Sequence, residues 1–215
     1  GSGWGELFTR GNRRALVTGI GLNAFQQLCG INVVVYFAPR LLTLAGFDKQ
    51  ASIALTAVVG VLQLCANAHL ARIVDARGRK PVAMIGLAGM GAGLAVLSLA
   101  FWPALALPGW AAVAAILLYR CSFSFSMGPL PYLISSEVFP ARVRPAGLAV
   151  SNAANWSANF VATATFLPLV SALETHIVWW LYAAVCALCA VFVRRVVPET
   201  AGASLNDVAR SKTEA

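Results

Sequence analysis

Charged residues are scarce in this sequence, and acidic residues are the scarcest of them. Only 11% of the 215 residues are charged, with 8 acidic against 16 basic side chains, whereas a soluble domain averages about 25% charged residues. Hydrophobic residues make up 59% of the chain. This composition excludes an ordinary soluble domain and predicts an integral membrane protein in a lipid bilayer. The net charge of +8 is explained by membrane topology, and no nucleic-acid partner is predicted.

The sequence also lacks the patterns of enzymes, metal sites and disulfide frameworks. All 5 cysteines lie inside apolar runs, where free thiols behave as small hydrophobic side chains. We find no nucleophile–base pair and no ligand spacing typical of a metal site. The sequence therefore predicts neither an enzyme nor a cofactor.

Apolar runs long enough to cross a bilayer, about 20 residues each, occur six times. The predicted spans are Leu16–Leu44, Ala51–Ala71, Val82–Trp102, Trp110–Ile134, Ala146–Leu169 and Ile177–Val193. Basic residues gather before the first span, after the second, fourth and sixth, and hardly at all on the other side. Because cytoplasmic loops are rich in Lys and Arg, both termini are predicted to be cytoplasmic.

These spans define three segments of an all-α membrane protein. Residues 16–196 form a domain of six transmembrane helices, flanked by cytoplasmic segments at 1–15 and 197–215. The polar content of the spans runs polar, polar, apolar, twice over, which indicates two three-helix units of the kind found in transporters built from inverted repeats. The chain begins at Gly1 rather than Met, so we expect a piece of a longer protein.

The most informative stretch is Phe25–Phe37, which places amides inside the first apolar run. Polar side chains at membrane depth usually face a bundle interior or a water-filled path. On an ideal helix Gln26 and Asn32 would point about 240° apart. Gly30 lies between them and is a weak point in a helix, so we predict a break there that turns both amides toward one cavity.

A second interruption is predicted in the fourth span at Met127–Tyr132, since proline removes a backbone donor and clashes with the preceding turn. Such defects are tolerated at membrane depth where the backbone faces protein or a cavity. In the fifth span, Asn152, Asn155 and Asn159 share one helix face. Arg120, inside the fourth span, is unexpected in a membrane helix.

Several ordered motifs resemble the C-terminal half of the sugar-porter branch of the major facilitator superfamily. They are QQLCGIN at 26–32 followed by Tyr36-Phe37, DARGRK at 75–80, GPLPY at 128–132 with SSEVFPARVR at 135–144, ANWSANF at 154–160, and Pro198-Glu199-Thr200. The family includes facilitative glucose transporters and proton–sugar symporters. The resemblance covers nearly the whole chain and implies transport of a monosaccharide by alternating access, together with a six-helix N-terminal half.

The resemblance also implies roles for individual residues. Sugar contacts are implied for Gln26, Gln27, Asn32, Gln63, Tyr132, Asn155 and Asn159. Tyr36 and Phe37 would belong to the outer gate. A cytoplasmic salt-bridge latch between the two halves is implied for Asp75, Arg79, Glu137 and Arg144. Tyr132 stands where many members have Trp, and Ser124 stands where several have a carboxylate.

Alternatives remain for the sites and for the function. The amides could join helices to one another rather than bind sugar, and the charged loops could serve topology alone. The chain could be a sugar sensor, an inactive fragment, or a half-transporter that dimerises. No acidic residue lies inside a span, so a proton-coupling group would belong to the N-terminal half, and uniport and proton symport both stay open. We expect the plasma membrane as the location.

Overall fold

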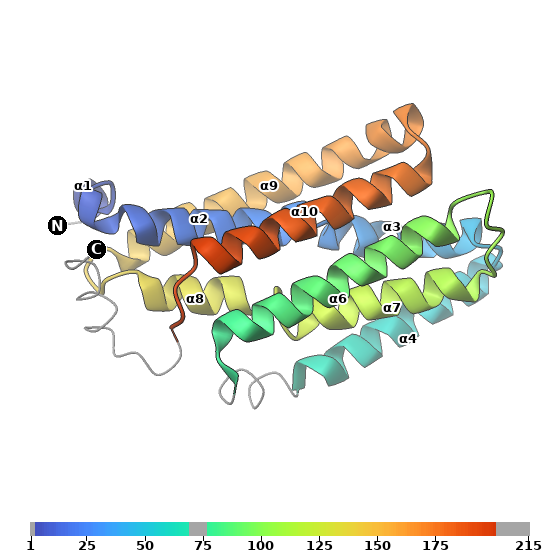
Figure 1. Ribbon diagram of the computed structural model, residues 1–215, viewed down its shortest axis with the longest axis horizontal. Coiled ribbons are helices and arrows are strands. Elements are labelled where there is room, and N and C mark those ends of the chain that lie inside the picture. The colour runs from blue at the N-terminus through green and yellow to red at the C-terminus, as the bar shows by residue number, and fades with distance from the viewer. Residues whose placement is uncertain (1–2, 69–76, 201–215) are drawn as a thin grey trace.

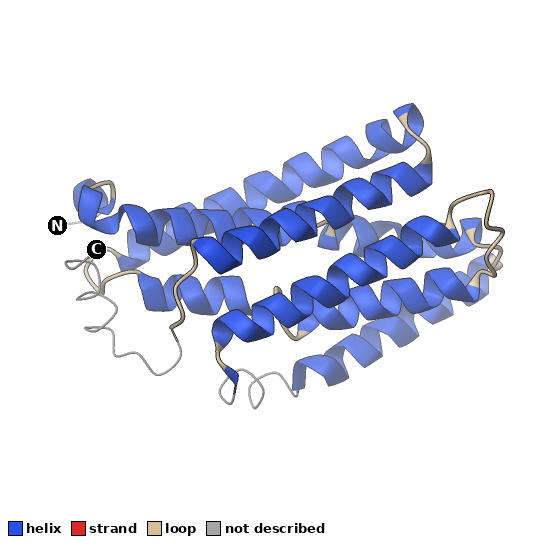
Figure 2. Ribbon diagram, in the orientation of Figure 1, coloured by secondary structure: helices blue, strands red, loops and turns tan. Residues whose placement is uncertain are grey.

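The computed structural model describes residues 3–68 and 77–200, and in these residues helices are joined by short loops with no strand (Figure 2). In chain order the helices are α1 (Trp4–Leu7), the short 3-10 helix η1 (Arg10–Asn12), α2 (Arg13–Leu28), α3 (Ile31–Leu44), α4 (Lys49–Ala68), α6 (Arg79–Ala100), α7 (Trp110–Ser124), α8 (Leu130–Val138), α9 (Arg144–Ala172) and α10 (Thr175–Arg195). The predicted all-α fold is confirmed.

The described helices match the six predicted spans, two of which are broken in the middle. Three segments are long and apolar enough by length and composition alone to cross a membrane: Arg10–Leu44, Arg79–Ala100 and Thr175–Arg195. The apolar stretches of α4 and α7 are shorter. In α7 this is because the helix is only the first part of a broken span. α9 has the length but carries the polar asparagine face.

The helices pack as two three-helix units of opposite direction. The first comprises α2 with α3, α4 and α6, and the second comprises α7 with α8, α9 and α10; α2 and α7 start at opposite ends of the bundle (Figure 1). α2 packs on α9 in the same way that α7 packs on α4. Likewise, α3 packs on α4 and α8 packs on α9. Each helix therefore keeps an equivalent partner when the two units are exchanged. α6 and α10 pack on each other. Inverted repeats produce this arrangement.

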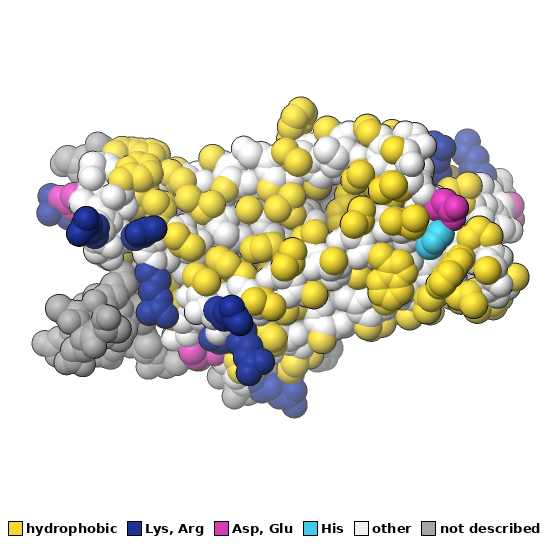
Figure 3. Space-filling view, turned by 45° about the horizontal axis from the view of Figure 1, so that its top comes forward, with side chains coloured by type: hydrophobic (Ala, Val, Ile, Leu, Met, Phe, Trp, Pro, Cys, Tyr) yellow, Lys and Arg dark blue, Asp and Glu magenta, His cyan; other side chains and the backbone are white. Residues whose placement is uncertain are grey.

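Charged side chains lie at the ends of the bundle. On the face seen in Figure 3, Lys and Arg gather mainly at the end that holds α1 and at the start of α6, with fewer at the opposite end, while hydrophobic side chains cover the middle. An apolar belt between charged ends is the surface that a bilayer requires, because charge at membrane depth is costly.

The first span breaks at Gly30, as predicted. α2 ends at Leu28 and α3 begins at Ile31, and Gly30 adopts a left-handed conformation with φ of 91°. The break leaves the Cys29 carbonyl without a helical partner, and the buried Tyr119 hydroxyl of α7 donates to it at 2.8 Å. A side chain from the other unit therefore satisfies the backbone of this break.

The second break lies between Ser124 and Leu130, slightly earlier than the predicted Met127–Tyr132 interruption. α8 already begins at Leu130, with Pro131 in its first turn. The prediction was wrong at this end because proline in the first turn of a helix costs no hydrogen bond. The Met127 and Gly128 carbonyls at this break accept bonds from a side chain of α2, described below.

Replacing Gly30 by Ala should destabilise the fold. Ala in a left-handed conformation is strained by about 1–3 kcal/mol, and the added Cβ would lie 2.8 Å from Tyr182 Cδ1. Thermal unfolding of the chain in detergent should show a melting temperature lower by several degrees. Gly91→Ala in α6 is the matched control, since its Cβ would meet only Cys186 Cβ at 4.0 Å. Equal melting temperatures for the two variants would contradict the proposed strain.

Candidate binding site

A buried pair of amides forms the inner part of a hydrogen-bond network between α2, α8 and α9. Gln26 is 2% exposed and Asn155 is 1% exposed. Gln26 Nε2 donates to the Met127 carbonyl at 2.8 Å and to the Gly128 carbonyl at 2.6 Å. Gln26 Oε1 accepts bonds from Asn155 Nδ2 and from Gln27 Nε2. The amide of Gln26 is fully used, so it holds the second helix break against α2.

Three half-buried amides form the outer part of the network. Gln27 Nε2 donates to Asn155 Oδ1 at 3.0 Å, and Asn32 Nδ2 donates to Gln27 Oε1 and to Asn159 Oδ1, both at 2.8 Å. Asn32 Oδ1 and Asn159 Nδ2 take part in no hydrogen bond among the described residues. These two atoms offer one acceptor and two donor hydrogens to a ligand.

The break at Gly30 explains why Gln27 and Asn32 meet. On a continuous helix these residues would lie about 140° apart, too far around the axis for a direct bond. The left-handed Gly30 restarts the helix in a new direction, and the Asn32 side chain then reaches back to Gln27 at 2.8 Å. The predicted break at Gly30 is present, but the amide that meets Asn32 is Gln27 and not the predicted Gln26, whose side chain bonds to the second break instead.

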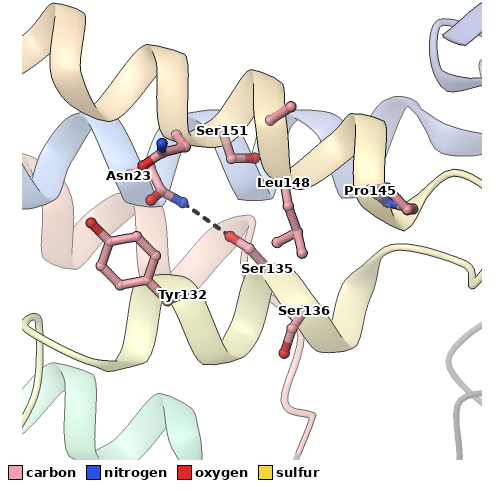
Figure 4. Close-up of a pocket in the computed structure, with 9 residues that line it drawn as sticks. Asn23, Tyr132, Ser135, Ser136, Pro145, Leu148 and Ser151 are labelled. Carbon is pink, nitrogen blue, oxygen red and sulfur yellow. Dashed lines mark hydrogen bonds between the residues drawn. The ribbon is translucent and has the colours of Figure 1, made fainter.

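A cavity of about 490 Å³ lies between α2, α8 and α9 (Figure 4). Tyr132, which is 46% exposed, lines it together with Ser135 and Asn23. Asn23 Nδ2 donates to Ser135 Oγ at 3.0 Å, while the buried Asn23 Oδ1 has no partner among the described residues. Tyr132 therefore faces this cavity, and no hydrogen bond joins it to the amide network.

Asn23 was not among the predicted site residues. Its backbone carbonyl accepts a bond from Asn155 Nδ2 at 3.1 Å, so it connects the cavity to the network. The available signal was its position three residues before Gln26, which places the two side chains on one helix face. Ser135 carried no signal, because serine is common in membrane helices.

Gln63 lies on α4 and makes no hydrogen bond with the other predicted sugar contacts. Gln63 Oε1 accepts a bond from Arg120 Nε at 2.8 Å, and the Gln63 backbone carbonyl accepts one from Ser124 Oγ at 3.3 Å. Gln63 thus belongs to a second polar site, formed by α4 and α7.

The two predicted gate residues differ in their surroundings. Tyr36 is 58% exposed on α3. Phe37 is half-buried, and its ring packs on Phe166 of α9 with centroids 4.7 Å apart. Within this chain Phe37 therefore joins α3 to α9. The gate assignment of both residues stays a prediction.

Two of the four predicted latch residues form an ion pair. Arg79 Nη2 at the start of α6 lies 3.0 Å from Glu137 Oε1 at the end of α8. The other Glu137 oxygen accepts a bond from Thr200 Oγ1. Glu199, which was not predicted, accepts bonds at 3.0 Å from the backbone N–H groups of Arg79 and Lys80. A carboxylate at a helix N-terminus pairs with unsatisfied donors and with the helix dipole.

Arg144, a third predicted latch residue, makes a different contact among the described residues. Arg144 Nε donates to the Phe139 carbonyl at 3.2 Å, and Arg144 forms no ion pair among the described residues. Asp75 lies outside the described residues. Arg142, at the same end of the bundle, pairs instead with Glu6 at 2.9 Å.

Comparison with known proteins identifies the class of this helical bundle. A sequence model described as "Sugar (and other) transporter" matches residues 1–211. The chain is 32% identical over 210 residues to the facilitated trehalose transporter Tret1 of Aedes aegypti, covering 95% of this chain and 26% of that protein. It is 35% identical over 199 residues to the D-xylose-proton symporter of Escherichia coli K12, covering 90% of this chain and 40% of that protein.

A solved structure agrees with these matches. The proton:xylose symporter XylE bound to 6-bromo-6-deoxy-D-glucose superposes with a TM-score of 0.81 at 35% identity, covering 91% of this chain and 42% of that one. The fold is thus that of a major facilitator carrier, and the chain belongs to the sugar transporter family. The chain spans less than half the length of these relatives.

Replacing Gln26 by Ala should lower the stability of the bundle. The change leaves the Met127 and Gly128 carbonyls and the Asn155 amide short of partners, and each buried unsatisfied group costs about 1–3 kcal/mol. The melting temperature of the chain in detergent should fall by several degrees. Gln50→Ala, at an exposed glutamine early in α4, should leave it unchanged. If Gln26→Ala melts like Gln50→Ala, the network is not a structural support.

Proposed function

We propose that this chain is the C-terminal half of a monosaccharide transporter that works by alternating access and that it supplies most of the sugar contacts. The observation that carries the proposal is the outer amide set, Gln27, Asn32 and Asn159. Gln27 is held by neighbouring amides, while Asn32 Oδ1 and Asn159 Nδ2 stay available to a ligand. A sugar hydroxyl both donates and accepts hydrogen bonds, so an acceptor beside a donor suits it.

The network contains no charged side chain, which suits the hydroxyl groups of a sugar. Every side chain in it is an amide or a hydroxyl, and each inner amide is already satisfied within the protein. A preformed network does not have to be ordered when the ligand binds, which reduces the entropic cost of binding. Relatives named as xylose and trehalose transporters, and a solved relative bound to a hexose analogue, support a sugar as the ligand.

The proposal includes a second six-helix half and a membrane location. The chain covers 40–42% of the xylose symporters it matches, which leaves room for a half of similar size. We place both termini in the cytoplasm, because the basic residues gather at the end of the bundle that holds α1 (Figure 3), and we take the plasma membrane as the location. Proton coupling, where present, would reside in the other half.

Sugar uptake into vesicles tests this function. The chain is reconstituted alone and joined to a six-helix N-terminal half of a sugar transporter, and uptake of D-xylose and D-glucose is compared. We expect uptake by the joined form only. In that form Asn32→Ala should weaken sugar binding more than tenfold, about 1.4 kcal/mol, while Gln50→Ala leaves it unchanged.

Other outcomes of this experiment separate the alternatives. Uptake by the chain alone would favour a dimerising half-transporter. Sugar binding without uptake in the joined form would favour a sensor. Unchanged sugar affinity in Asn32→Ala, with a lowered melting temperature, would mean that the outer amides only join helices.

The Arg79–Glu137 pair is proposed to belong to a cytoplasmic latch that stabilises the outward-open state. Both side chains are partly buried, with 16% and 22% exposed, and a pair of this kind contributes up to about 1 kcal/mol. Glu137→Gln in the joined form should therefore raise the inward-open population about fivefold. Cysteine labelling of the cavity from each side of the membrane measures this population.

The matched control for the latch is Glu6→Gln, which breaks the more exposed pair with Arg142. This variant should leave the labelling pattern unchanged. The latch is rejected when Glu137→Gln labels like the wild type from both sides.

A further inference from the structure

Arg120 is a charged side chain inside the fourth membrane span. It lies on α7 and is 8% exposed. A guanidinium keeps its charge under all ordinary conditions, and buried charges at membrane depth are normally paired with another charge or with backbone carbonyls. The groups around Arg120 therefore indicate what it binds.

Only one of its nitrogen atoms is hydrogen-bonded within the described residues. Arg120 Nε donates to Gln63 Oε1 at 2.8 Å, and Ser124 Oγ holds the backbone of Gln63 against α7 at 3.3 Å. The two Nη groups donate no bond among the described residues, and neither is among the fully enclosed atoms that lack a partner. Gln63 thus orients the guanidinium and leaves both Nη groups available.

No carboxylate of this chain neutralises Arg120 in the described structure. None of the 8 acidic residues lies inside a predicted span. Glu137 pairs with Arg79 and Glu6 pairs with Arg142, while Glu174 contacts His176, all at the ends of the bundle. The described residues therefore supply no counter-charge for Arg120.

The geometry fits a carboxylate better than a phosphate. Two Nη groups match the two oxygens of a planar carboxylate. A phosphate monoester carries about −1.5 to −2 charges at neutral pH, so one guanidinium would leave net negative charge at membrane depth. Arg120 is the one basic residue in the fourth predicted span, and a single cation balances a single carboxylate.

Arg120 lies on the same broken span as a carbonyl that is bonded to the amide network. Gly128, whose carbonyl accepts a bond from Gln26, follows Arg120 by eight residues on the same span. Arg120 also follows Tyr119 directly, and the Tyr119 hydroxyl donates to the Cys29 carbonyl at the first helix break. Arg120 therefore belongs to the part of α7 that contacts this break.

We propose that Arg120 and Gln63 form a carboxylate-binding site whose carboxylate comes from outside this chain. This inference rests on the proposed sugar-transport function. Two sources share this chemistry: a sugar substrate that carries a carboxylate, such as a hexuronate, or an acidic side chain of the other six-helix half. Both would form the same paired contact with the two Nη groups.

A matched pair of sugars distinguishes the sources. D-glucose and D-glucuronate differ only in the carboxylate at C6, and their affinities are measured in the joined two-half transporter by uptake competition and by the rise in melting temperature. If the substrate supplies the carboxylate, the wild type binds glucuronate at least tenfold more tightly than glucose. Arg120→Met then abolishes this preference and leaves glucose affinity within about twofold.

If the other half supplies the carboxylate, the wild type shows no preference for glucuronate, and Arg120→Met lowers glucose uptake at least tenfold. Replacing the paired acidic residue of the other half by its amide should then restore uptake in Arg120→Met. Arg120→Lys keeps the charge but loses the paired geometry. Arg120→Lys replaces Arg120→Met in these experiments if Arg120→Met does not fold. It should lower the glucuronate preference, or the glucose uptake, at least threefold.

The proposal fails if wild type and both Arg120 variants show equal affinities for the two sugars and equal glucose uptake. It also fails if Arg120→Met loses uptake and no acid-to-amide replacement in the other half restores it. Arg40→Met, at an exposed arginine of α3, is the control for loss of one positive charge. Absence of uptake in the wild type would contradict the transport function alone, because the melting temperatures still compare the two sugars.

Discussion

Two helices break at membrane depth, and the rest of the structure depends on how their backbone carbonyls are satisfied. Lipid offers no hydrogen bonds, so each exposed carbonyl would cost several kcal/mol. Tyr119 of the second unit donates to the Cys29 carbonyl in the first break, and Gln26 of the first unit donates to the Met127 and Gly128 carbonyls in the second. Each unit completes the backbone of the other, which fixes how the two units pack.

This exchange also determines how the amides divide their roles. All hydrogen-bonding groups of the Gln26 amide are bonded, to carbonyls of the second break and to neighbouring amides. Gln26 therefore holds the neighbouring amides in position. Asn32 bonds to Gln27 and to Asn159, and both asparagines retain an unused polar atom. In the proposed function, joining helices and binding sugar are therefore tasks of different amides within one network, and a substitution should affect stability or affinity according to its place in that network.

Local features of the sequence predicted the fold and part of the site. The apolar runs, Gly30 and the two clusters of amides are visible in a single chain, because each depends on neighbouring residues. The pairing of Gln63 with Arg120 and of Glu199 with the start of α6 joins residues 57 and 120 positions apart. Such contacts depend on helix packing. Asn23 was only partly predictable. Its spacing from Gln26 is visible in the sequence, but the cavity that it lines depends on helix packing.

The most direct measurement is a structure of the assembled two-half transporter with a bound monosaccharide. The account predicts sugar hydroxyls at about 2.7–3.2 Å from Asn32 Oδ1 and Asn159 Nδ2, with Gln26 still bonded to Met127 and Gly128. A sugar bound without contact to Asn32 or Asn159, or a Gln26 side chain turned away from the helix break to hold the sugar, would contradict it.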